Sequence, residues 1–212
     1  MDLARPIRSV VPTLDGPVLE VLAATTRPLT GLEVHRLAEA GSPNGIRRVL
    51  ARLVDQGVVN ATEHSAATFY VANRDHLAWP AIETLARMRR TLLDRLQADL
   101  AAWQSAPIHA SLFGSMARGT GDATSDIDIL IVRPTGTGED DSPWAEQVDS
   151  LRRRVRAWTG NHCQAFQIDL ERLSEHVAAG DPLVQEWVRD SLTLVGPSFH
   201  RLLTQLPAGG RA

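Results

Sequence analysis

The chain has 212 residues, of which 43% are hydrophobic and 22% charged, and its formal net charge is −3. These values are typical of a soluble globular protein with one large domain or two small ones. No apolar run approaches the ~20 residues that a membrane-spanning helix needs. Residues 1–6 also lack the apolar core of a secretory signal. We therefore expect a cytoplasmic protein without a membrane partner.

The sequence contains no lysine, since all 22 of its Lys and Arg residues are arginines. This absence excludes two classes of enzyme. A P-loop needs a lysine to reach nucleotide phosphates, and a pyridoxal phosphate enzyme needs one for its Schiff base. The single cysteine, Cys163, likewise excludes an intrachain disulfide and a cysteine metal cluster.

Residues 1–75 are expected to form a domain with three helices followed by a hairpin. The first helix is expected to begin after Asp15, which would cap it, and the second begins at a capping box formed by Thr30 and Glu33. The third begins at Ser42, and its apolar positions keep helical spacing. Those positions are Ile46, Val49, Leu50, Leu53 and Val54.

Two short strands, Val58-Val59 and Phe69–Val71, follow the third helix. In this order of elements, the segment Thr30–Val71 resembles the winged helix-turn-helix domains of bacterial regulators. The third helix carries polar side chains suited to DNA phosphates and base edges, namely Asn44, Arg47, Arg48 and Arg52. Residues 1–75 nevertheless contain eight arginines and eight acidic residues, a net charge of zero. Contact with DNA and contact with protein are therefore equally favoured.

Residues 76–105 are expected to form one long linking helix. Its apolar residues recur every three or four positions: Ile82, Leu85, Met88, Leu92, Leu96, Leu100 and Trp103. Such a stripe buries one face of a helix, either against the C-terminal domain or against a second copy of the chain in a homodimer. Packing against the C-terminal sheet is the favoured interpretation.

Residues 106–212 alternate between expected strands and helices, which makes the whole chain α+β. The expected strands are Ile108–Phe113, Asp126–Val132, Ala165–Leu170 and Leu192–Val195, and the expected helices are 143–158 and 182–190.

Two carboxylates stand at the start of the second of these strands. Side chains alternate across a strand, so Asp126 and Asp128 share one face. The opposite face, which must be core, carries Ile127, Ile129 and Ile131. Two adjacent carboxylates repel each other and lose hydration, and a divalent cation between them relieves both effects. Mg²⁺ fits, because it binds through a few carboxylates while keeping waters and substrate phosphates.

Gly114 and Ser115 lie where the first expected strand gives way to a helix. Gly114 lets the backbone approach a ligand closely, and the Ser115 hydroxyl and the N–H groups at the helix start would face the β- and γ-phosphates of a nucleotide. Arg118 could neutralise phosphate charge or pair with a loop acid, and both interpretations are equally favoured.

The stretch Leu112–Gly119 followed by Ser125–Val132 resembles the minimal nucleotidyltransferase branch of the DNA polymerase beta superfamily. The shared pattern is Gly-Ser, a spacer near ten residues, Asp-x-Asp with apolar neighbours, and a third acid on a later strand. The resemblance covers about half of the chain. It implies a mixed sheet flanked by helices over residues 106–212, with Asp169 as the third acid.

The family resemblance also implies the chemistry. Two divalent ions, Mg²⁺ or Mn²⁺, would act with ATP or another nucleoside triphosphate. Asp126 and Asp128 would bind both ions, and Asp169 would serve the ion nearer the attacking hydroxyl, as a ligand or as general base. A nucleoside monophosphate, most often AMP, would pass to a hydroxyl of a protein or a small molecule. Relatives include antitoxins that modify HEPN-type toxins and enzymes that adenylylate aminoglycosides.

A DNA-binding regulator is the alternative hypothesis. In it the winged helix binds DNA and the nucleotidyltransferase domain senses a nucleotide, in an antitoxin-like role. A domain that has lost transfer activity is a further alternative, although the retained Gly114, Ser115, Asp126 and Asp128 argue against decay. The sequence names neither the acceptor nor the nucleotide base.

Overall fold

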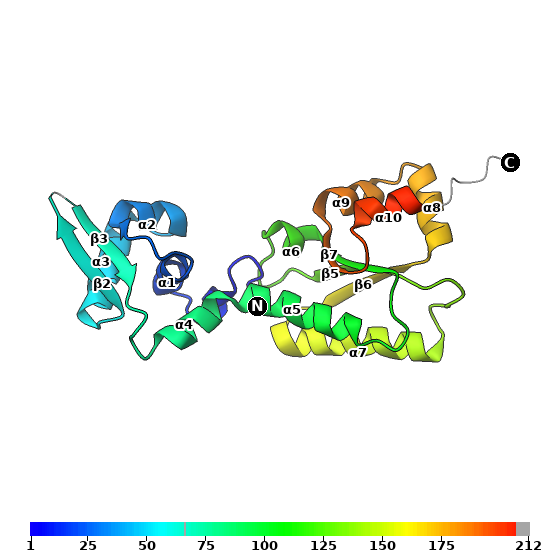
Figure 1. Ribbon diagram of the computed structural model, residues 1–212, viewed down its shortest axis with the longest axis horizontal. Coiled ribbons are helices and arrows are strands. Elements are labelled where there is room, and N and C mark those ends of the chain that lie inside the picture. Colours follow the sequence, from blue (N-terminus) through cyan, green and yellow to red (C-terminus); the bar gives the residue numbers. More distant parts are fainter. Residues whose placement is uncertain (66, 207–212) are drawn as a thin grey trace. The chain divides into compact units, whose positions relative to one another are not determined.

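The computed structural model describes residues 1–65 and 67–206, which form two compact units. The N-terminal unit comprises Asp2 and Ala4–Arg90. The C-terminal unit comprises Met1, Leu3 and the described residues from Thr91 onward. Figure 1 labels the elements of both units.

The N-terminal unit contains helices followed by a hairpin (Figure 1). Its helices are η1 (Pro6–Ser9), α1 (Asp15–Ala23), α2 (Gly31–Ala38), α3 (Pro43–Asp55) and α4 (Trp79–Ala86), and its strands are β1 (Leu29–Thr30), β2 (Val59–His64) and β3 (Ala67–Ala72). The strands β2 and β3 pair antiparallel, and β1 adds to β3, so the sheet order is β1-β3-β2. The core contains Val18, Leu22, Val34, Ile46 and Leu50.

Local capping sets where α2 and α3 begin. The Thr30 hydroxyl accepts a hydrogen bond from the Glu33 N–H, and the Glu33 carboxylate accepts one from the Thr30 N–H at 2.8 Å. This confirms the predicted capping box. Ser42 caps α3 in the same way, through the N–H of Gly45. Asp15 is already the first residue of α1 rather than its cap.

The segment predicted as one helix over residues 76–105 forms two helices. The first is α4, and the second is α5 (Met88–Ala101), with a break at Arg87. The apolar stripe divides with them, because each helix packs in the core of a different unit. The residues concerned are Trp79 and Ile82 in α4, and Leu92, Leu96 and Leu100 in α5. The second half of the stripe therefore packs against the C-terminal sheet, as favoured from the sequence.

The C-terminal unit contains a mixed four-stranded sheet with the order β6-β5-β4-β7. Its strands are β4 (His109–Phe113), β5 (Ile127–Val132), β6 (Cys163–Ile168) and β7 (Leu192–Val195). The strand β4 runs antiparallel to β5 and β7, whereas β5 and β6 are parallel. This confirms the expected α+β class with a mixed sheet.

Helices cover both faces of this sheet (Figure 1). One face packs against α5 and α7 (Ser142–Thr159), and the other packs against α8 (Leu170–Ala178), α9 (Pro182–Asp190) and α10 (Phe199–Gln205). The short helix α6 (Gly114–Arg118) connects β4 to the loop before β5. Among residues 1–65 and 67–206, no helix combines the length and the apolar character that crossing a membrane requires.

Candidate active site

The two predicted carboxylates lie together at the start of β5. Asp126 directly precedes the strand and Asp128 is its second residue. Because Ile127 is fully buried in the core under α5 and α7, strand alternation places both carboxylates on the opposite face, which carries α8, α9 and α10. Both are half-buried, so solvent reaches them. We call Asp126 and Asp128 the carboxylate pair.

Gly114 lies against the carboxylate pair. The preceding residue, Phe113, pairs with Asp128 in the antiparallel ladder of β4 and β5. Gly114 has a φ of +68°, and a Cβ at this position would lie 2.5 Å from Asp128 Oδ2. Any other residue would therefore strain the backbone and displace the carboxylate. The two halves of the sequence motif are in direct contact in the fold.

The helix after Gly114 is short, because α6 has only five residues. The Ser115 carbonyl accepts hydrogen bonds from the N–H groups of Thr120 and Gly121 at 2.9 and 3.2 Å, which closes the loop that follows. Arg118, which ends α6, forms an ion pair with Asp190 of α9. Of the two interpretations of Arg118, the structure contains the pairing with an acid, although that acid lies on a helix rather than a loop.

The electrostatic environment of the carboxylate pair is negative. Burial raises the pKa of Asp128 above its usual value, and the negative charges of Asp126 and of Glu186 on α9 raise it further. Arg118 opposes this effect. A carboxylate held beside other negative charges is stabilised when a cation binds, so the pair is suited to a divalent ion. Burial raises the pKa of the neighbouring Cys163 thiol to about 12, which disfavours the thiolate that a nucleophile needs.

Asp169 does not join the carboxylate pair, so the prediction that it is the third acid is wrong. The strand expected to extend to Leu170 ends at Ile168, and Asp169 instead caps α8. One carboxylate oxygen accepts a hydrogen bond from the Arg172 N–H at 2.8 Å, and the other pairs with Arg133 at 3.2 Å.

The register of the parallel strands explains this correction. Asp128 pairs with Gln164 across β5 and β6, so Asp169 follows five residues after the position beside the pair. At about 3.3 Å per residue, the two positions are ~16 Å apart, at opposite ends of the sheet.

Gln164 instead occupies the position beside the carboxylate pair. Its Nε2 donates a hydrogen bond to Asp126 Oδ2 at 3.4 Å. Sequence reasoning missed both Gln164 and Glu186. Aligning the starts of the two parallel strands would have identified Gln164. Glu186 lies on α9, far from Asp128 in the sequence, and no pattern near either residue predicts that they are close.

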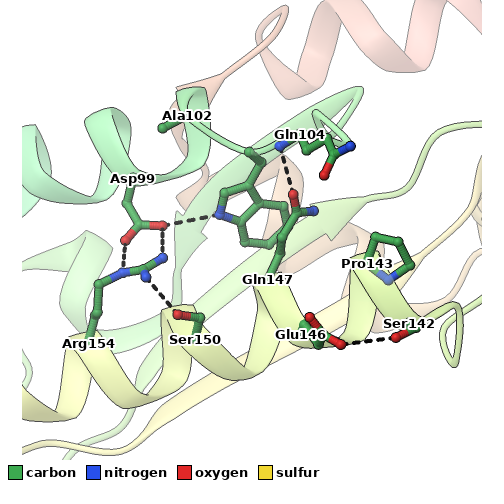
Figure 2. A pocket seen from close by; sticks show the side chains of 10 residues that line it. Asp99, Ala102, Gln104, Ser142, Pro143, Glu146, Gln147, Ser150 and Arg154 are labelled. Atoms are coloured by element: carbon green, nitrogen blue, oxygen red, sulfur yellow. Dashed lines mark hydrogen bonds and ion pairs between the residues drawn. The ribbon is translucent and has the colours of Figure 1, made fainter.

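A groove of about 630 Å³ lies elsewhere in the C-terminal unit, between the end of α5 and α7 (Figure 2). These helices cover the sheet face opposite the carboxylate pair. Asp99 pairs with Arg154 and accepts a hydrogen bond from Trp103 Nε1 at 3.1 Å. Gln147 accepts one from the Gln104 N–H at 2.7 Å. These polar groups hold the end of α5 against α7, so the residues that line the groove stabilise the packing of the two helices.

The candidate DNA-binding residues lie on α3. Asn44, Arg47 and Arg48 are exposed. Arg52, in the last turn, forms an ion pair with Asp15 of α1. All four side chains are therefore exposed, and Arg52 is also paired with a residue of a neighbouring helix.

Comparison with known proteins agrees with the geometry of the C-terminal unit. The family described as "Nucleotidyltransferase domain" matches residues 91–178. Residues 91–178 are therefore similar to a nucleotidyltransferase domain. The matched range begins where the compact C-terminal unit begins and includes Gly114 and the carboxylate pair. No curated protein matches the chain.

The carboxylate pair fits a divalent ion. Domains of this family use nucleoside triphosphates and divalent metals, and Mg²⁺ in such sites binds one or two carboxylates together with substrate phosphates. The carboxylate pair meets that requirement. Within residues 1–65 and 67–206, no three His, Cys, Asp or Glu side chains are grouped to hold a metal.

Proposed function

We propose that this domain transfers a nucleoside monophosphate, AMP from ATP, to a hydroxyl group of a protein or a small molecule. The family match over residues 91–178 supports nucleotidyl transfer in general. The observation that carries the proposal is the contact between Gly114 and Asp128, because it brings the two halves of the motif to one point.

In the proposed reaction, the acceptor hydroxyl attacks the α-phosphorus of the triphosphate. The bond from that phosphorus to the bridging oxygen breaks, pyrophosphate leaves with the electron pair, and the hydroxyl proton passes to water. Asp126 and Asp128 would hold Mg²⁺, which neutralises charge on the phosphates when bound. Gly114 and Ser115 would lie beside the phosphates, and Arg118 would stay paired with Asp190 beside them.

The test is transfer of label from α-³²P-ATP, with Mg²⁺, to components of a cell lysate. We expect Asp126→Asn and Asp128→Asn to lose at least ~100-fold of the labelling, because each removes a negative oxygen that holds the ion. Asp140→Asn is the matched control, since Asp140 is an exposed residue of the loop before α7. Labelling by both variants at the wild-type rate would contradict the proposal.

A second candidate function concerns the N-terminal unit, which we propose is a winged helix-turn-helix that binds DNA. The observation in its favour is the exposure of Asn44, Arg47 and Arg48 on one helix, α3. In such domains the helix that follows the turn enters the major groove. The nucleotidyltransferase domain would then act as a nucleotide sensor or as an enzyme tethered to DNA, in an antitoxin-like role.

Binding to the promoter DNA of its own gene, measured over a range of salt concentrations, tests this second function. We expect Arg47→Ala and Arg48→Ala each to weaken binding and to lower the salt dependence by about one released ion. Arg153→Ala makes the same charge change at an exposed position of the C-terminal unit and serves as the control. The absence of binding to promoter or random duplex at low salt would exclude DNA binding.

A further inference from the structure

The surroundings of the carboxylate pair determine how many ions it can hold. On the β4 side, Asp128 faces Phe113 in the ladder, and Gly114 follows directly. On the β6 side, the paired residue is Gln164. The helix α9 contributes Glu186, whose charge reaches Asp128, but the three acids are not grouped as metal ligands among the residues that the structure describes.

Gln164 differs from a carboxylate in two ways at this position. Its amide carries no charge, so the two strands present two negative groups rather than three. Its Nε2 also donates to Asp126 Oδ2 at 3.4 Å, which directs the positive end of an amide dipole at an oxygen that would bind a metal.

The two negative charges of Asp126 and Asp128 balance the two positive charges of one divalent ion. Two divalent ions in a shared site lie about 3.5–4 Å apart and repel each other strongly. A second ion therefore needs a further negative ligand that the first ion does not use. The pair has none on its β4 side, where Phe113 stands, and an uncharged amide on its β6 side.

We infer that the domain holds one divalent ion per bound nucleotide, and that Gln164 sets this number. The inference rests on the proposed function, because it takes the carboxylate pair as the site of the nucleotide-bound ion. It replaces the two-ion arrangement that the family resemblance implies. The ion is held by Asp126 and Asp128 together with phosphate oxygens, and the Gln164 amide lies beside Asp126.

The experiment counts Mn²⁺ ions by electron paramagnetic resonance on the full chain saturated with a non-hydrolysable ATP analogue. Wild-type protein is expected to bind one Mn²⁺ per nucleotide. Gln164→Glu is expected to bind two, because the new carboxylate supplies the missing charge beside Asp126. Gln164→Asn, which keeps a neutral amide, is the matched control and is expected to remain at one.

Two results would overturn the inference. Two ions bound by the wild-type protein would show that the pair needs no third carboxylate. One ion bound by Gln164→Glu would show that residue 164 does not set the number. Failure of the proposed function would give a different result. In that case the wild-type protein would bind one Mn²⁺ with the analogue but would transfer no label from ATP to any acceptor.

Discussion

At the scale of single residues, the site depends on a glycine that no other residue can replace. Gly114 combines a positive φ with a virtual Cβ placed 2.5 Å from Asp128 Oδ2. The first property strains the backbone of any substitute, and the second moves a carboxylate of the proposed metal site. Substitution of Gly114 is therefore expected to affect both the stability of the fold and the proposed binding of a nucleotide.

We expect Gly114→Ala to lower the free energy of unfolding by about 1–3 kcal/mol and to weaken binding of the Mg²⁺–ATP analogue. Gly136→Ala is the control, because Gly136 also has a positive φ of +82° but no atom within 4 Å of its virtual Cβ. Chemical denaturation and isothermal titration calorimetry measure the two effects. The prediction fails if both variants bind the nucleotide equally well.

At the scale of elements, the beginning of α2 depends on a charged cap. The Thr30 N–H, which donates to the Glu33 carboxylate, is the main cause of the lowered pKa of Glu33, and the Arg27 guanidinium adds to it. The pKa of Glu33 is about 2, compared with 4.5 for an ordinary glutamate.

This lowered pKa predicts how stability depends on pH. A group whose pKa is lower in the folded state stabilises the protein fully above its unfolded pKa and loses that contribution as pH falls through the folded pKa. We therefore expect Glu33 to stabilise α2 above pH 4.5 and to lose this effect towards pH 2. Unfolding of wild type and of Glu33→Gln, measured from pH 6 to about pH 2, should converge at the acidic end. A constant difference between the two proteins across that range would contradict this assignment.

The contact between α5 and α7 provides a further prediction at the element scale. The Asp99 side chain is 5% exposed and its carboxylate is paired with Arg154 (Figure 2). Removing the guanidinium leaves a nearly buried carboxylate without its cation, so Arg154→Ala should cost ~1–3 kcal/mol of unfolding free energy. Arg153→Ala, an exposed neighbour on the same helix, should cost much less. Equal losses in the two variants, measured by urea denaturation, would show that the pair contributes nothing specific.

At the scale of the whole molecule, the chain has two compact units, and each has its own hydrophobic core. The candidate nucleotide site lies entirely in one of them. Homodimer formation remains a prediction from the sequence, since the buried residues of α5 contribute to the core of their own chain.

Hydrogen exchange tests whether nucleotide binding is confined to the C-terminal unit. We expect Mg²⁺ with a non-hydrolysable ATP analogue to slow amide exchange in α6 and at the start of β5, because those segments surround the site. Exchange in α3 should stay unchanged, because its buried residues belong to the other core. Slower exchange in α3 would indicate that the nucleotide acts on both units, as a sensor requires.

Sequence patterns correctly predicted the features that depend on interactions between residues close together in the chain. The capping box of Thr30 and Glu33 predicted the beginning of α2, and Ser42 with Pro43 predicted that of α3. The alternation of isoleucine and aspartate in β5 predicted which side chains are buried. The break at Arg87 was missed, because one helical period runs through both α4 and α5, and only packing into separate cores divides them.

The sequence by itself determined the motif: Gly114, Ser115 and the carboxylate pair, whose spacing indicates a nucleotidyltransferase. Only the tertiary structure decided which residues lie beside the pair. Asp169 looked suitable as a polar residue inside an expected apolar strand, yet the register of β5 and β6 puts Gln164 beside Asp128 and leaves Asp169 at the other end of the sheet. The physical reason is that strand register depends on packing between segments distant in sequence, which no local pattern encodes.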